Sequence, residues 1–237
     1  MMKKRLSEIF SKSKRTSTSQ KSIVTHKDVE HDVESLISFW EFMKKLLWHA
    51  FSYLNDADKI VSSLLRRWDE KFIEELKKTS FVLDKILKII ENLCHSFNTH
   101  IDTARFNLQT RETVVEVMIL LLDLDIGEPA TPKKPTLNNY ENLEIPQLLE
   151  TILKFIKTLT SFYNKLNEEC DSLIKELKKL QPQIRKLPWD TILEKIELLL
   201  WDHKKLHKSF DKFYEALENL EEVLRHLHEN IEKVVEK

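Results

Sequence analysis

The chain has 237 residues, 38 Lys and Arg against 39 Asp and Glu, and a single glycine, Gly127. Sheet proteins and nucleotide-binding loops need glycine and proline at many tight turns, so one glycine and six prolines argue against both. With 32% charged residues the composition is typical of long helices, and we predict an all-α fold: an elongated antiparallel bundle, or coiled-coil hairpins, of long amphipathic helices.

Residues 1–27 predict a flexible, basic, Ser/Thr-rich tail. They contain eight Lys and Arg, one acid, and too little apolar surface to offset the entropy of ordering. Such a tail suits contact with nucleic acid or with an anionic membrane, on which Leu6, Ile9 and Phe10 would let it lie. The alternative is a solubilising tail without a partner. The contacts would be made by Lys3, Lys4, Arg5, Lys12, Lys14 and Arg15.

Residues 28–124 predict an N-terminal helical half. Apolar residues over Asp28–Leu54 recur in alternating steps of three and four, which is the seam of a heptad repeat. Asn55-Asp56-Ala57-Asp58 then predicts a break followed by a new N-cap.

The helical pattern resumes after this expected break and continues to about Leu108. A kink or break is expected at Thr79-Ser80 or at Ser96–Thr99, where strong helix formers are few. A shorter helix, Arg111–Leu124, is apolar on nearly every face and is expected at the centre of the bundle.

Residues 125–145 predict a linker, because Gly127 and three prolines interrupt any helix there. Residues 146–237 predict an antiparallel hairpin of two heptad helices, Pro146–Gln181 and Asp190–Lys237, joined by a short turn. Asp190 is the expected N-cap of the last helix, with Thr191 and Glu194 as an alternative capping box.

The last helix is longer than its expected partner by about 12 residues, or roughly 18 Å at helical rise. Leu227, Ile231 and Val234 continue its apolar seam over that extension. Because bare apolar seams are unfavourable in water, we expect the hairpin to pack on the N-terminal half.

His203 and His207 lie one helical turn apart, which is the spacing of two metal ligands on one helix face. The two lysines between them oppose a bound cation, and His203 occupies a position of the apolar seam, where one polar residue can fix helix register. We therefore predict a seam histidine and no metal, and expect His203→Leu to be neutral or stabilising. The alternative is a metal-dependent helical enzyme that uses both histidines.

The two cysteines, Cys94 and Cys170, each fall inside a helical pattern and are interpreted as small buried hydrophobic side chains. Whether they form a disulfide is open at this point, since pairing does not follow from sequence. No residue set has the pattern of a nucleophile with its base and oxyanion donors, so we predict no catalytic residue, no metal and no cofactor.

The longest unbroken apolar run, Val117–Leu122, is far shorter than the roughly 20 residues that span a bilayer. We expect a soluble, intracellular protein of the cytoplasm. Its most consistent function is non-enzymatic: a structural or protein-interaction bundle that binds a protein partner or itself. The alternatives are an architectural protein of virus or mobile-element type, contacting nucleic acid or an anionic membrane through the tail, and the metal-dependent enzyme.

Overall fold

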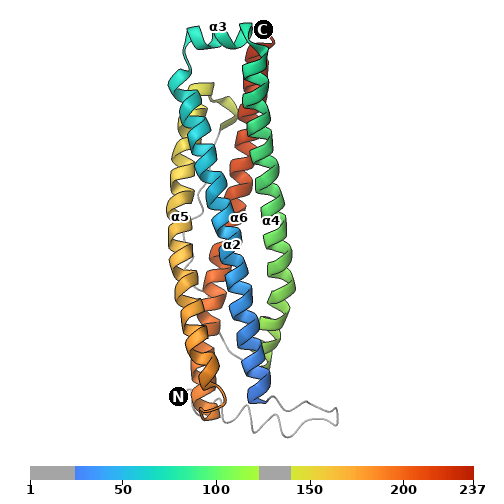
Figure 1. Ribbon diagram of the computed structural model, residues 1–237, viewed down its shortest axis with the longest axis vertical. Helices are drawn as coiled ribbons and strands as arrows, with labels where there is room; N and C mark the ends of the chain where they lie inside the picture. The colour runs from blue at the N-terminus through green and yellow to red at the C-terminus, as the bar shows by residue number, and fades with distance from the viewer. Residues whose placement is uncertain (1–24, 123–139) are drawn as a thin grey trace.

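The computed structural model describes residues 25–122 and 140–237, and within these two ranges the structure is all-α, without a strand (Figure 1). The all-α prediction is therefore confirmed for the described residues. The helices are α2 (His26–Arg67), α3 (Glu70–Lys78), α4 (Ser80–Leu122), α5 (Ile145–Leu180) and α6 (Trp189–Val235), with the short 3-10 helices η1 (Tyr140–Asn142) and η2 (Gln181–Gln183).

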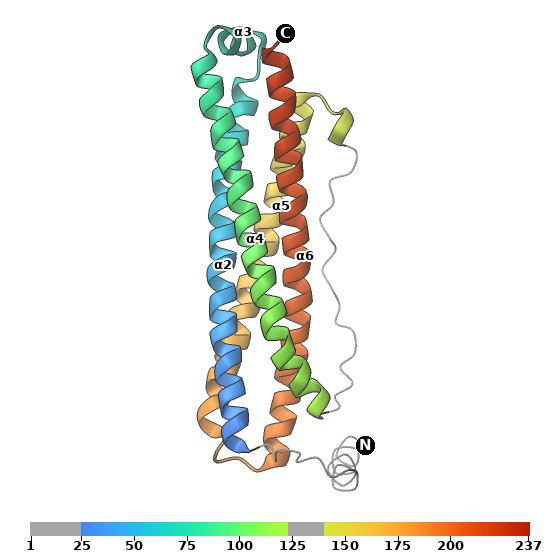
Figure 2. The same cartoon turned by 90° about the vertical axis from the view of Figure 1, so that its right-hand side faces the viewer.

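The long helices α2, α4, α5 and α6 lie side by side along the length of the bundle, and α3 lies across one end (Figures 1 and 2). Helices α2 and α6 run in one direction, and α4 and α5 run in the other. Each of α2 and α6 packs against both α4 and α5. Helix α4 ends at the opposite end of the bundle from the start of α5, and Thr25 and Lys237 also lie at opposite ends.

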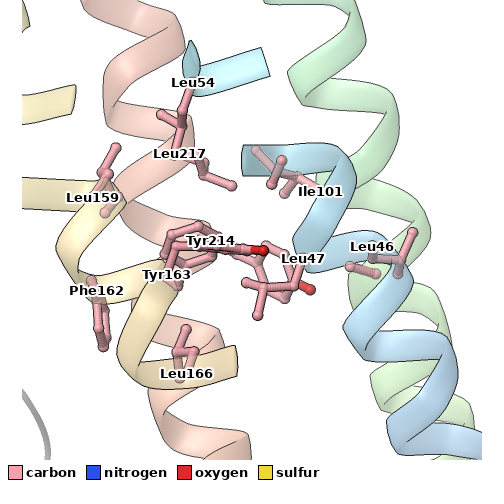
Figure 3. Close-up of a cluster of buried hydrophobic side chains, with 14 of the residues drawn as sticks. Leu46, Leu47, Leu54, Ile101, Leu159, Phe162, Tyr163, Leu166, Tyr214 and Leu217 are labelled. Atoms are coloured by element: carbon pink, nitrogen blue, oxygen red, sulfur yellow. The ribbon is translucent and has the colours of Figure 1, made fainter. Parts of the chain in front are cut away.

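One continuous core runs through the bundle from Val29 to Ile231. Heptad spacing places an apolar stripe on each long helix, and the four stripes face the common axis. Each large side chain that is fully buried there contributes on the order of 1.5–3 kcal/mol. Figure 3 shows part of this core, to which every long helix contributes; its labelled residues include Leu47, Leu54, Ile101, Leu159, Phe162, Leu166, Tyr214 and Leu217.

Helix α2 begins earlier than the sequence predicts. Thr25 is the N-cap of a capping box: the Asp28 backbone N–H donates to the Thr25 hydroxyl, and the Thr25 backbone N–H donates to the Asp28 carboxylate at 2.7 Å. His26 and Lys27 are therefore helical, which corrects the C-terminal boundary of the predicted tail. The six basic residues proposed as contacts lie outside the described residues.

The predicted break at residues 55–58 is wrong, because α2 continues to Arg67. Leu54 and Ala57 are fully buried, and Val61 and Leu64 extend the same seam. Asp56 faces solvent and pairs with Lys59 at 3.1 Å, so the poor helix formers do not compete with core packing. The break comes at Trp68, and the Asp69 carboxylate caps α3 by accepting from the Phe72 N–H at 2.7 Å.

The break expected at Thr79 is confirmed, since α3 ends at Lys78 and α4 begins at Ser80. The alternative break at Ser96–Thr99 is wrong: α4 runs through it, and the Thr99 hydroxyl donates to the His95 carbonyl at 3.0 Å. A separate helix Arg111–Leu124 is also wrong, because α4 continues unbroken to Leu122. Its expected place at the bundle centre concerns side chains outside the described part.

The two C-terminal helices follow the predicted boundaries to within two residues, and Pro146 lies in the first turn of α5. The predicted caps of the last helix are wrong. Pro188, with φ −59° and ψ 148°, is the N-cap of α6 and provides no side-chain hydrogen bond. Pro188 holds the chain extended directly before the helix. Asp190 therefore lies in the first turn, where its negative charge interacts favourably with the helix dipole.

The far end of α6 is covered by the N-terminal helices: α4 packs along α6, and α3 also contacts it. Leu227 and Ile231 are buried, and Val234 packs against the core. Removing these contacts would return the apolar stripe of α6 to water.

We expect the two halves to remain associated after the chain is cut between them. The cut is made at a protease site inserted between Ala130 and Thr131. Because α2 packs on α5 and α4 packs on α6, the two fragments should co-elute in gel filtration and unfold in one thermal transition. Two fragments that separate and each stay folded and monomeric would show two independent domains.

Candidate functional site

A buried hydrogen bond joins α2 to α6 across the interior. Trp40 Nε1 donates to His203 Nδ1 at 3.0 Å, and the exposed fractions are 0% for Trp40 and 6% for His203. Nδ1 is thus the acceptor, which places the ring proton of the neutral imidazole on Nε2. Burial, reinforced by nearby His207, lowers the pKa of His203 to about 3. His203 is therefore a neutral core residue at neutral pH.

His207 lies one turn after His203 on α6, and the centroids of the two rings are 6.2 Å apart. His207 Nδ1 lies 3.8 Å from the Asp211 carboxylate, whereas its buried Nε2 and the buried Tyr214 hydroxyl have no hydrogen-bond partner. Burial also raises the pKa of Tyr214.

The two histidines do not each offer a lone pair to one ion. His203 Nδ1 accepts the Trp40 N–H, and His203 Nε2 carries the ring proton. Among the side chains that the structure describes, no three of His, Cys, Asp or Glu gather as metal ligands would. The geometry gives no support to the metal-dependent alternative.

The hydrogen bond changes the expectation for His203→Leu. Leucine suits an apolar seam, but it would leave the buried Trp40 N–H without an acceptor, which costs about 1–3 kcal/mol. We expect His203→Leu to lower the free energy of unfolding by that amount in urea denaturation. His203→Gln, whose amide oxygen can accept the bond, should be less destabilising. A His203→Leu protein at least as stable as the wild type would restore the expectation from sequence.

Both cysteines are buried free thiols, so the open question of a disulfide is answered in the negative. The Cys94 thiol donates to the Glu221 carbonyl at 3.8 Å, and the Cys170 thiol donates to the Trp40 carbonyl at 3.6 Å. Burial raises the pKa of Cys94 to about 11 and that of Cys170 to about 12. Since the thiolate is the reactive form, neither is a competent nucleophile at neutral pH.

A second group of aromatic side chains lies at the surface, where α2 meets α4. It consists of Trp48, His49 and Tyr53 of α2 and His100 of α4, and we call it the aromatic–histidine cluster. The His49 and His100 rings stack at 5.1 Å with 4° between their planes, and His100 Nε2 is 3.2 Å from the Tyr53 hydroxyl. Burial and the neighbouring His49 lower the pKa of His100.

The geometry of the cluster does not suit chelation of a metal ion. Imidazole lone pairs lie in the ring plane, so two stacked parallel rings do not aim them at one ion. Trp48 meets His49 edge-on at 5.2 Å and is 58% exposed, an unusual exposure for so large an apolar side chain. Sequence reasoning missed this cluster because its two helices are far apart in the chain, and heptad periodicity does not say which faces meet.

Other large apolar side chains are also exposed on the outer faces of the bundle. Phe81 on α4 is 76% exposed, and on α6 Leu198 is 66% and Trp201 is 39% exposed. The Lys205 ammonium lies 5.8 Å from the centroid of the Trp201 ring. Within the described ranges, no helix has the length and apolar character to cross a membrane.

The site residues expected from sequence thus divide into two groups. His203 is buried at the seam, as predicted, with His207 beside it, whereas Lys3, Lys4, Arg5, Lys12, Lys14 and Arg15 lie outside the described residues. Comparison of the chain with protein-family models, with curated proteins and with solved structures finds no match.

Proposed function

We propose that the protein is a non-enzymatic bundle that acts through protein–protein contact, with the aromatic–histidine cluster as its binding surface. The observation that supports the proposal best is the exposure of Trp48 beside stacked histidine rings. Tryptophan and tyrosine are enriched at protein interfaces because each buries a large apolar area and keeps a polar group for hydrogen bonding.

The surrounding architecture also suits this role. The cluster bridges two long helices whose inner faces pack into the same core, so its side chains sit on rigid elements. A preorganised surface loses little conformational entropy on binding. The buried polar groups, in contrast, are accessible to no partner in the folded bundle.

The proposal is tested by comparing Trp48→Ser with Lys45→Ser, an exposed position one turn earlier on the same helix. Both variants should unfold like the wild type, because neither side chain is in the core. Self-association is measured by sedimentation velocity over a range of protein concentrations. Partner binding is measured by quantitative affinity capture from the native source.

We expect one of these two associations to be present in the wild type, retained by Lys45→Ser and weakened at least about tenfold by Trp48→Ser, as for an interface anchor. A monomeric wild type that captures the same proteins as Trp48→Ser would overturn the proposal.

A further inference from the structure

We propose that the stacked rings of His49 and His100 act as a pH-sensitive switch in the aromatic–histidine cluster. While both rings are neutral, their stacking holds the cluster in the arrangement that a partner binds. When both rings carry a proton, they separate, and acid thereby releases the partner. The release of a partner rests on the function proposed above, whereas the separation of the rings does not.

The ring pair joins two helices at the surface of the bundle. His49 belongs to α2 and His100 to α4, and their rings lie parallel with 5.1 Å between centroids. Two neutral aromatic rings attract each other when they stack in this way. His49 is exposed and His100 is half-buried, so protons from the solvent reach this contact, as they do not reach the buried core.

The surroundings of the pair do not stabilise two positive charges. The charged or titratable residues one helical turn from either ring are Lys45 and Tyr53, both on α2. The residues at that spacing from His100 on α4 are uncharged: Ser96, Phe97, Thr103 and Ala104. Within the described residues, the ring contacts of the pair come from α2 and α4 alone. A second proton therefore meets a like charge with no acid one turn away to offset it.

The pair consequently takes up its two protons in separate steps. Burial and the neighbouring His49 both lower the pKa of His100. The first proton leaves one charged ring beside a neutral ring, which creates no repulsion between them. The second proton places two cations at the stacking distance, so the doubly charged pair is more stable with its rings apart.

Separation of the rings changes the whole cluster, because each of the other two members contacts one ring of the pair. Trp48 meets His49 edge-on at 5.2 Å, and the Tyr53 hydroxyl lies 3.2 Å from His100 Nε2. A partner that covers these side chains removes the imidazoles from water, which favours their neutral form. Binding and protonation therefore oppose each other: association is complete while the rings are neutral and is lost as the pH falls and the second ring becomes charged.

The acid response of His203 is a different effect and has to be kept apart. His203 is buried and acts on the stability of the whole bundle, whereas the ring pair acts on one surface. The experiment is therefore carried out on the full chain both with and without His203→Gln, which removes the titrating core histidine. Circular dichroism verifies that each protein stays helical at every pH used.

The test follows the histidine rings by NMR of the histidine-labelled chain between about pH 8 and 4.5, a range that includes the ordinary histidine pKa. The Cε1–H resonances report the protonation of each ring, and cross-peaks between ring protons of His49 and His100 report the stacking. His49→Gln removes one ring of the pair. The matched control is His95→Gln, which removes an exposed imidazole elsewhere on α4.

We expect cross-peaks between the two rings at pH 8, and their loss in step with the second titration. His100 should titrate at a higher pH in His49→Gln than in the wild type, and His95→Gln should leave both observations unchanged. Cross-peaks that persist after both rings are charged would overturn the proposed separation. So would a His100 ring that stays neutral down to pH 4.5.

The release of a partner is tested with the association assays described above, repeated across the same pH range. Association of the wild type and of His95→Gln should weaken at least about fivefold in acid, and that of His49→Gln should weaken less. Titrating groups of the partner act equally in all three proteins, so the difference between them reports the ring pair. Equal pH dependence in His49→Gln and in the wild type would overturn the release. Absence of any association would refute the proposed function and its regulation, while the NMR titration still decides whether the rings separate.

Discussion

Trp40→Ala should lower the free energy of unfolding by about 3–5 kcal/mol, the range for deleting a fully buried large aromatic side chain. Trp40 contacts rings on two elements: Phe39 beside it on α2, and His203 and Phe210 on α6, at 5.0, 5.3 and 5.5 Å between centroids. Its removal opens a cavity at the centre of the bundle and leaves His203 Nδ1 without its donor. Urea denaturation followed by circular dichroism measures the change.

Trp48→Ala is the matched control for that measurement, because it removes the same side chain from the surface of the same helix. Its effect should stay within about 0.5 kcal/mol. Equal losses of stability from the two substitutions would show that Trp40 is not packed in the interior.

Acid should destabilise the bundle through His203. Its pKa is about 3 in the folded protein against 6.5 when unperturbed, so below pH 6.5 the unfolded chain binds a proton that the folded chain does not. The stability is complete above the unfolded pKa and is lost as pH falls toward the folded pKa. One such proton changes the free energy of unfolding by about 1.4 kcal/mol per pH unit.

His203→Gln isolates this contribution, because the amide accepts the Trp40 N–H bond and does not titrate. Other groups titrate in both proteins, so they cancel in the difference between wild type and variant. Between pH 6 and 4.5 the wild type should lose about 2 kcal/mol relative to His203→Gln. Parallel stability curves over this range would contradict a buried neutral His203.

The sequence predicts the long helices well where one apolar seam continues without competition. In α5 and α6 the alternation of three and four runs through each helix, and the boundaries follow it. In α2 the poor helix formers Asn55 and Asp56 predict a break, yet Leu54 and Ala57 keep the seam in phase, and burial outweighs local propensity.

The candidate sites were less accessible to sequence reasoning, because periodicity identifies the inner face of a helix but not its neighbour. His203 was recognised as a seam residue, while its donor Trp40 lies 163 residues away on a helix that runs parallel to α6. His49 and His100 likewise meet only because α2 and α4 are adjacent. Pairing across helices depends on topology, which the order of amphipathic segments leaves open.

The opposite placement of Thr25 and Lys237 has a mechanical consequence. A pulling force applied between these two residues acts along the bundle axis and draws α2 and α6 in opposite directions, so that each slides past α4 and α5. Side chains packed along the whole length of the helices then resist this shear at the same time. If the two pulled residues were at the same end of the bundle, the helices would instead separate one turn at a time. Under tension between these two residues, the bundle would extend little at first and would then unfold abruptly.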